Sequence, residues 1–536
     1  MIKRLFSTAS TSVVSAAVIV AGFSLLSRVV GFVRDRILAG IFGAGDELDI
    51  YYAAFRVPDF IFQLIVIGAL SACFIPVFTK YFGKDDAKAW RYTSNIVNLL
   101  LLVFIGIAAV GIVLAPMYTP WVTHGFSAAK QAQVAIATQI LFLGQAFFAV
   151  SMVFGSVLQG AKRFILYSFA PIVNNLGILF GAIFLVPMMG LMGLAWGAVL
   201  GALLHALIQT VGVYALGYRY SLTLDLWDKD VRQTIKQTGP RVMGIAVGQM
   251  NFLLMTAIAT GLTAGSVTVL QFAYNLNFFP IGIIGVSYAI AAFPTFCEFV
   301  KGDEATKLRE AFSATVRQVM FFIIPATIIS LLLRAQIVRL VFGAGDFDWT
   351  ATIATADTLA MFALSFFAQC LVFVIIRVFF AYEDSWTPFA AGVIAAILNG
   401  VGGFVLAPLY GVPGLAWAFS LASMVQLAML WVFLKGKLGS LDEKVILKST
   451  AILSLAGLAA AAVTQSVKYT VVEYVQLDTF MNVLLQTAAA GGAGLFMYFA
   501  TAFILRSPEM MAFAGGLRAR FFRTAKPTET VQQELV

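Results

Sequence analysis

Long apolar stretches recur along the whole chain and are separated by short polar segments. A helix needs about 20 mostly apolar residues to cross a bilayer. The pattern therefore predicts about fourteen membrane-spanning helices and an all-α integral membrane protein. The predicted spans are residues 14–38, 50–79, 92–115, 132–160, 166–187, 190–216, 239–262, 265–297, 311–333, 351–381, 387–408, 412–434, 445–466 and 481–505.

Composition supports a chain that faces hydrocarbon over most of its length. Hydrophobic residues make up 61% of the 536 residues and charged residues 11%, and the mean hydropathy is +0.92. A soluble domain carries about 25% charged residues. The formal charge of +9 does not indicate a nucleic-acid partner, because most basic residues lie in short loops between apolar segments.

The distribution of Lys and Arg predicts the orientation in the membrane. Basic residues gather in the segments 80–91, 219–241, 301–309 and 435–448 and in the tail. The loops on the other side contain few: Lys130, Arg334, Arg339 and Lys468. Because cytoplasmic loops are enriched in basic residues, both termini are expected in the cytoplasm. The first helix continues through arginines into a second span and is not expected to be a cleaved signal peptide.

Two segments of the chain resemble each other. LVPMMGLMGLAW at 185–196 returns as LAPLYGVPGLAW at 406–417, an offset of 221 residues (414 − 193). This repeat predicts two six-helix bundles of the same orientation, related by a pseudo-two-fold axis around a central cavity. The expected domains are the bundles at 1–220 and 221–438, two additional helices at 439–507, and a basic cytoplasmic tail at 508–536, whose end from Lys526 is expected to be disordered.

Ionisable residues are concentrated in the first two predicted spans. SRVVGFVRDRILAG carries Arg28, Arg34, Asp35 and Arg36, and DIYYAAFRVPDF carries Asp49, Arg56 and Asp59. Each such group costs at least about 2.5–3.5 kcal/mol inside hydrocarbon. They are therefore expected to face a polar cavity, a partner or a ligand.

Arginine in such a cavity favours an anionic guest. A guanidinium stays charged at any physiological pH and binds phosphate through paired donors, so a pyrophosphate-linked lipid is the predicted ligand class. A bend at Gly31 would bring Arg28 and Arg34 to one cavity, and Pro58 is expected to kink the second helix. In the competing interpretation, ion pairs near the membrane surface join Arg36, Asp35, Asp49 and Asp59. Arg34 then extends its guanidinium towards the interface.

Enzymatic and metal chemistry have little support in the sequence. Cys73, Cys297 and Cys370 lie in apolar runs without metal-ligand spacing, so no cofactor or metal is expected. A membrane enzyme acting on polyprenyl phosphates would need clustered acids or histidines, and the acidic cluster GAGDELD at 43–49 is predicted on the outer side. FGAGD at 42–46 and 342–346 is interpreted as two glycine-rich outer turns, not as phosphate loops.

The stretch SRVVGFVRDRILAGIFGAGDELDIYYAAFRVPDF resembles the MurJ/MviN family of lipid II flippases, within the multidrug/oligosaccharidyl-lipid/polysaccharide exporter superfamily. The similarity continues through AKRFILYSFAPIVNNLGILFGA and FFAYEDSWTPFAAGVIAAILN and covers essentially the whole chain. It implies a bacterial inner-membrane flippase, not an enzyme, that moves lipid II outward by alternating access. Arg28, Arg34 and Asp35 match essential family positions, and Asp49 and Arg56 match charged ones.

The chain departs from that family pattern at several positions. Phe62 and Gln63 occupy a site where relatives have a basic pair, Asn275 replaces an arginine, and Ile67 replaces an acid. The resemblance thus implies lipid II held by Arg28, Arg34, Arg56 and polar groups such as Asn275, with another undecaprenyl-pyrophosphate-linked oligosaccharide as the alternative.

The sequence also bears on the energy source of transport and on the oligomeric state. Gln249, Asn251 and Asn399 offer oxygen ligands for sodium, but no carboxylate accompanies them in their spans. Coupling to the membrane potential is the simpler expectation, since moving one charge through 100 mV is worth about 2.3 kcal/mol. A monomer is expected.

Overall fold

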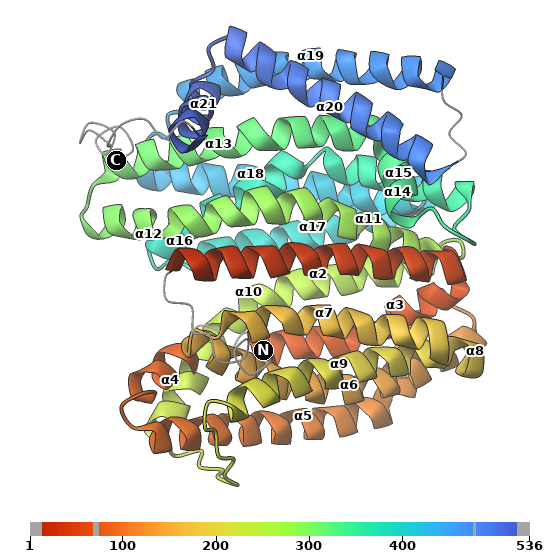
Figure 1. The fold of residues 1–536 in the computed structure, drawn as a ribbon, viewed down its shortest axis with the longest axis vertical. Helices are drawn as coiled ribbons and strands as arrows, with labels where there is room; N and C mark the ends of the chain where they lie inside the picture. The colour runs from red at the N-terminus through yellow and green to blue at the C-terminus, as the bar shows by residue number, and fades with distance from the viewer. Residues whose placement is uncertain (1–12, 68–73, 475–478, 522–536) are drawn as a thin grey trace. The chain divides into compact units, whose positions relative to one another are not determined.

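The structure, a computed structural model, describes residues 13–67, 74–474 and 479–521 (Figure 1). Every regular element among these residues is a helix, which confirms the predicted all-α class. The chain divides into two compact units. Unit 1 comprises residues 1–268 and 341–351, and unit 2 comprises 269–340 and 352–536. The end of the predicted tail, from Lys526, and Cys73 lie outside the described residues.

Unit 1 is built around the pair α6 and α9. Helices α5 and α3 pack on α6, α7 packs on α9, and α2 packs on α7 (Figure 1). Its helices are α2 (Val13–Phe42), α3 (Asp46–Phe62), α4 (Ile75–Tyr81), α5 (Asp86–Val122), α6 (Ala128–Gly160), α7 (Phe164–Phe180), α8 (Val186–Met189), α9 (Leu191–Tyr214) and α10 (Lys229–Thr260), with π-helical turns η1 (Gln63–Ile67) and η3 (Gly181–Leu185).

Helix α10 belongs to unit 1 by its contacts. It packs on α3, η1 and α5, whereas the repeat places it at the start of the second half. The compact units are therefore divided later in the chain than residue 220. The domain boundaries at residues 220 and 438, which follow from the sequence repeat, stay a prediction.

Unit 2 contains the pairs α17–α18 and α19–α20, with α13 packed against α19 and α16 packed against α18. Its helices are α11 (Ser266–Ile281, which begins in unit 1), α12 (Ser287–Lys301), α13 (Ala305–Leu332), α14 (Arg334–Phe342), α15 (Trp349–Ala363), α16 (Phe366–Ala381), α17 (Trp386–Tyr410), α18 (Val412–Leu438), α19 (Glu443–Tyr474), α20 (Phe480–Ile504) and α21 (Pro508–Phe521), with the π-helical turn η4 (Gly282–Val286). The predicted tail thus begins with a helix.

Ten helices of the described residues are long and apolar enough to cross a membrane, or eleven if the bent pair α15–α16 forms one span. The three remaining predicted spans correspond to α2, to α3 with α4, and to α10. Helix α2 carries four charged residues, α3 has 17 residues, and the first turns of α10 are polar. The number of spans refers to the described residues only. The multi-pass architecture is confirmed, and the number fourteen stays a prediction.

The backbone repeats with the offset of 221 residues. Gly190 and Gly411 both adopt a left-handed conformation, with φ of 60° and 64° and ψ of −147° and −145°. Lys162 and Glu383, which are also 221 residues apart, both have a φ of 58°. These matched turns extend the similarity seen in the sequence to the conformation of the chain.

Close approach between η3 and α9 depends on glycine. A Cβ on Gly197 would lie 2.5 Å from the Cα of Gly181, and a Cβ on Gly177 would lie 2.3 Å from the Cα of Gly201. Small residues of this kind let membrane helices pack at short distance. These glycine contacts hold α7 and η3 against α9 and so position Asn174 and Asn175 of α7.

Candidate functional site: charged residues on the first two helices

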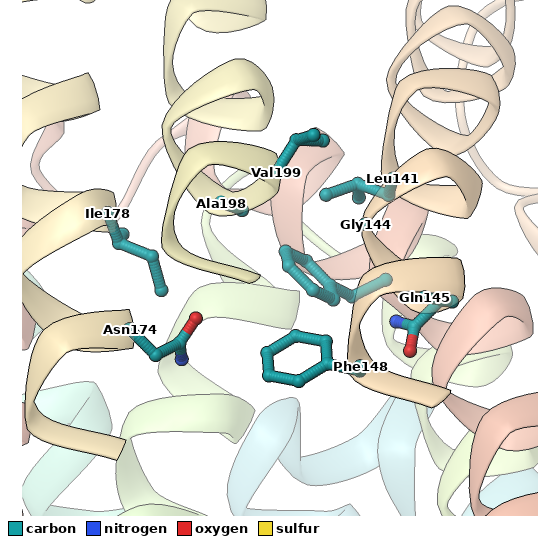
Figure 2. A pocket seen from close by; sticks show the side chains of 9 residues that line it. Leu141, Gly144, Gln145, Phe148, Asn174, Ile178, Ala198 and Val199 are labelled. Carbon is teal, nitrogen blue, oxygen red and sulfur yellow. The ribbon is translucent and has the colours of Figure 1, made fainter. Parts of the chain in front are cut away.

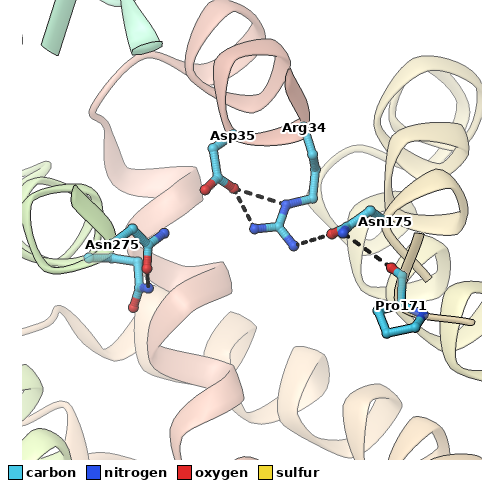
Figure 3. A network of polar contacts seen from close by, with 6 residues as sticks. Arg34, Asp35, Pro171, Asn175 and Asn275 are labelled. Carbon is cyan, nitrogen blue, oxygen red and sulfur yellow. Dashed lines mark hydrogen bonds and ion pairs between the residues drawn. The ribbon is translucent and has the colours of Figure 1, made fainter. Parts of the chain in front are cut away.

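Arg34 lies in a polar network between α2 and α7 (Figure 3). Its Nε and Nη2 donate to Oδ1 of Asp35 at 2.9 and 2.6 Å, and its Nη1 donates to Oδ1 of Asn175 at 2.8 Å. Asn175 in turn donates to the carbonyl of Pro171 at 3.2 Å. Asp35 is almost completely buried, while the Arg34 side chain keeps 23% of its exposure.

This network neutralises one of the predicted cations. The competing interpretation includes an ion pair of Asp35. In the structure Asp35 forms an ion pair with Arg34. Arg36 donates to the carbonyl of Gly343 at 2.8 Å. Arg28 is half-buried on α2, six residues before Arg34.

Asp49 holds a turn at the start of α11. Its two carboxylate oxygens accept the backbone N–H groups of Gly265 and Thr268, each at 2.8 Å, and the hydroxyl of Thr268 at 2.7 Å. The side chain is 1% exposed. A carboxylate used in this way caps a helix N-terminus, so this geometry favours a structural role for Asp49 over ligand contact.

Arg56 and Asp59 face α10. The Arg56 guanidinium lies 4.2 Å from the ring centre of Phe252. Asp59 accepts from Nε2 of Gln63 at 2.7 Å, and Gln63 accepts from Gln249 at 2.5 Å. Pro58 lies inside α3, which continues to Phe62 before the π-helical turn η1.

Five of the predicted site residues fall into three groups within unit 1. Arg34 with Asp35 and Arg56 with Asp59 lie in two polar groups of unit 1, and Asp49 lies in a third. Asn275 belongs to unit 2, where its Oδ1 accepts from Gln271 at 2.8 Å. Phe62, at one position of the missing basic pair, is buried in an aromatic cluster with Phe104 and Phe148.

Asn175 and Phe252 were not predicted as partners of the arginines. Asparagine inside the apolar run PIVNNLGILF was a usable indication, because an amide in hydrocarbon needs a hydrogen-bond partner. Phe252 is one of 49 phenylalanines in the chain, so nothing in the sequence indicated its contact with Arg56.

The two FGAGD turns meet in unit 1. The N–H of Asp346 donates to the carbonyl of Gly40 at 3.0 Å, and a Cβ on Gly345 would lie 2.1 Å from that oxygen. A Cβ on Gly43 would lie 2.7 Å from the carbonyl oxygen of Asp346. The interpretation of both motifs as glycine-rich turns agrees with these contacts, since Gly43 and Gly345 each have a positive φ.

A cavity of about 50 Å³ lies between α6, α7 and α9 of unit 1 (Figure 2). Its lining is mainly apolar, with the amides of Gln145 and Asn174. The side-chain oxygens of both have no hydrogen-bond partner among the described residues. The volume accommodates a few waters and is far too small for a lipid headgroup, so this cavity is not the expected ligand site.

Comparison with known proteins gives one consistent family. The chain is 28% identical to a probable lipid II flippase MurJ of Treponema pallidum over 441 residues, which cover 79% of this chain and 82% of the relative. It is also 28% identical to that of Haemophilus influenzae over 482 residues, with coverages of 86% and 94%.

Solved structures show the same fold. A structure titled lipid II flippase MurJ, inward closed conformation, matches with a TM-score of 0.75 and 21% identity and covers 91% of this chain and 98% of its own. An inward-facing multidrug MATE transporter of the MOP superfamily matches with a TM-score of 0.65, 11% identity and coverages of 80% and 99%. These likenesses confirm the predicted transporter fold.

The family model described as "Lipid II flippase MurJ" matches residues 38–485, which is most of the chain. The predicted family is thereby confirmed, together with a transporter rather than an enzyme and a multi-pass location in a bacterial inner membrane. The chain belongs to the lipid II flippase MurJ family.

Proposed function

We propose that this protein moves lipid II, the lipid-linked peptidoglycan precursor, from the inner to the outer leaflet of the bacterial cytoplasmic membrane by alternating access. The observation that carries the proposal is the family match over residues 38–485. The charges of α2 and α3 add a physical reason, because an anionic headgroup needs cations inside an apolar bundle.

Among the proposed substrate residues, Arg28, Arg34 and Arg56 bind the phosphates. Arg34 is the best defined, since Asp35 and Asn175 fix its guanidinium and leave part of it exposed. A guanidinium held in a fixed plane loses little entropy when it forms paired bonds to phosphate. Asp35 is therefore a positioning residue.

Asp59 and Asn275 complete the proposed set as polar contacts for the sugar or peptide part of the headgroup, and Asp49 supports the site by holding the start of α11. Asp59 already orients Gln63. Amide and carboxylate groups are suitable partners for hydroxyl and peptide groups.

A second candidate substrate is another undecaprenyl-pyrophosphate-linked oligosaccharide. Its support is the replacement of family arginines by Phe62 and Asn275, which removes cationic contacts. Both candidates share the pyrophosphate that the arginines of α2 would hold, and they differ in the group attached to it.

For the working cycle we propose a monomer with both termini in the cytoplasm. The duplicated halves at 1–220 and 221–438 would open the site alternately to the two sides of the membrane. Residues 439–507 would form two additional helices, and residues 508–536 a cytoplasmic tail. The membrane potential would reset a site with excess positive charge, at about 2.3 kcal/mol per charge per 100 mV.

Complementation tests the function and the site together. A bacterial strain depleted of its own lipid II flippase should regain growth with this chain and lose it with Arg28→Ala or Arg34→Ala at equal membrane abundance. Lys130→Ala is the matched control, because Lys130 forms a partly exposed ion pair with Asp46 and should rescue fully. Absence of rescue by the wild-type chain, with the oligosaccharide exported instead, would favour the second substrate.

A further inference from the structure

The segment at 219–227, between α9 and α10, is held against α5 in an extended arrangement. Asn98 donates to the carbonyls of Ser221 and Thr223 at 3.0 and 2.9 Å, and Asn95 exchanges two hydrogen bonds of 2.9 Å with the backbone of Asp225. From Ser221 to Leu226 the residues alternate between partly buried and exposed, which is typical of an extended chain lying on a surface.

The outward positions of this segment are apolar. Leu222 is 90% exposed and Trp227 is 82% exposed, and Leu224 and Leu226 are each about half exposed. Because Ser221, Thr223 and Asp225 are tied to α5, the side chains of Leu222, Leu224 and Leu226 between and beside them are held outward instead of collapsing onto the protein. A fixed, exposed apolar stripe of this kind marks an interaction surface.

The segment lies level with the edge of the apolar part of α5. Lys88 and Arg91 precede Asn95, and a nearly continuous apolar run begins at Ile96. Asn95 is nine residues into the helix, or about 14 Å along its axis at 1.5 Å per residue. The segment therefore lies beside the part of α5 where polar residues give way to the apolar run. Figure 1 shows this loop beside α5.

A buried aromatic group holds the start of the segment against unit 1. Tyr218 packs edge-on against Trp90, Phe154 and Tyr214, with ring centres 5.2 to 5.6 Å apart. Tyr218 and Trp90 are 3% and 7% exposed, so this group lies inside the protein. Trp227, at the other end of the segment, is 82% exposed, and exposed tryptophan concentrates where a bilayer meets water.

Exposed charge around the segment is positive. The basic side chains on its flanks are all exposed: Arg219, Lys229, Arg232 and Lys236. The nearby acids are partly buried in local hydrogen bonds. Asp225 and Asp228 accept backbone N–H groups, and Asp230 accepts the hydroxyl of Tyr81.

We infer that the segment at 219–227 is an interfacial membrane anchor. Leu222, Leu224 and Trp227 would lie at the boundary between headgroups and acyl chains, and the flanking basic residues would bind the phosphates of anionic lipids. The inference is independent of the transported substrate and fixes the depth of the α9–α10 connection.

Depth-dependent fluorescence quenching tests this anchor in the full chain. A small fluorophore on Leu222→Cys, in vesicles of phosphatidylcholine and phosphatidylglycerol, should lose most of its emission to lipids brominated near the headgroup end of the acyl chain. The same fluorophore on Lys84→Cys, in the exposed turn between α4 and α5 at the same end of unit 1, should respond to aqueous iodide instead. Unsubstituted protein provides the background from the native cysteines.

A second comparison tests how much the basic residues contribute to membrane binding of the segment. Omitting phosphatidylglycerol, or combining Lys229→Gln with Arg232→Gln, should reduce quenching by brominated lipid at position 222. Quenching at 222 by iodide but not by brominated lipid would overturn the inference. Protection from both quenchers would also overturn it, because it would indicate cover by protein such as a second copy. Since the Leu222 side chain is nearly all exposed, its substitution should leave folding intact, which size-exclusion chromatography checks.

Discussion

The Arg34 guanidinium and the Asn175 side chain, 141 residues apart in the sequence, are joined by a hydrogen bond of 2.8 Å from Nη1 to Oδ1. This bond connects α2 to α7 and completes the arrangement in which Asp35 takes the other side of the guanidinium. An arginine inside an apolar helix is thus held in one orientation before any ligand arrives, and binding a phosphate need not include the entropy of ordering that side chain.

Removing the amide should release this arginine. Asn175→Ala leaves a donor of a charged group without its partner, which costs about 1.5–3 kcal/mol. We expect a lower unfolding temperature in detergent and weaker complementation. The control is Asn174→Ala, since the side-chain oxygen of Asn174 has no partner among the described residues. Equal losses in both variants would contradict a specific role for Asn175.

Asp49 should act through structure rather than through charge alone. Asp49→Ala removes the acceptor of three hydrogen bonds, and losing a helix cap costs about 0.5–2 kcal/mol. Asp49→Asn retains one acceptor oxygen and should lose less. Thermal unfolding of both variants, beside the exposed Glu47→Ala, measures the difference. Full stability with loss of transport only would indicate that Asp49 contacts the substrate.

The glycine contact between η3 and α9 should tolerate no added methyl group. Gly197→Ala places a Cβ 2.5 Å from the Cα of Gly181, and overpacking of a tight contact costs about 1–3 kcal/mol. Gly248→Ala in α10 meets nothing within 4 Å and should be neutral or slightly stabilising. Unfolding temperatures that fall equally in the two variants would count against a close-packed contact between η3 and α9.

Acid should weaken the turn between α16 and α17. Burial alone would raise the pKa of Asp384, but hydrogen bonds from Lys437 and Thr387 outweigh it and lower the pKa to about 2. A carboxylate with a lowered folded-state pKa contributes stability above its ordinary value of 3.8, and this is lost as the pH falls towards 2.

The measurement is the difference in unfolding temperature between wild type and Asp384→Ala as a function of pH. We expect a constant difference near neutral pH that shrinks below about pH 4. A difference that grows on acidification would show that the ion pair with Lys437 has the opposite effect.

Much of the architecture was predictable because its physical cause is local. Apolar run length predicts membrane helices, and the two GLAW segments predicted a repeat that the backbone shows at Gly190 and Gly411. The assignment of α10 to unit 1 was not predictable, since it depends on packing against α3 and α5.

The unusual polar residues of the first two helices were recognisable from the sequence, but their pairing was not. Charges inside apolar spans identified Arg34, Asp35 and Arg56 as unusual, because such groups are costly there. Their partners lie far away in the sequence: Asn175 on α7 and Phe252 on α10. The capping contact of Asp49 likewise joins residues more than 200 positions apart, which periodicity along the chain does not reveal.

The central claim is that arginines of α2 hold the pyrophosphate of a lipid-linked precursor during its passage across the membrane. The direct measurement is the rate of lipid II translocation by purified protein in vesicles, comparing wild type with Arg28→Ala, Arg34→Ala and the control Lys130→Ala. We predict translocation by wild type and control and little by either arginine variant at equal incorporation and unfolding temperature. Undiminished translocation with both arginines removed would contradict the account.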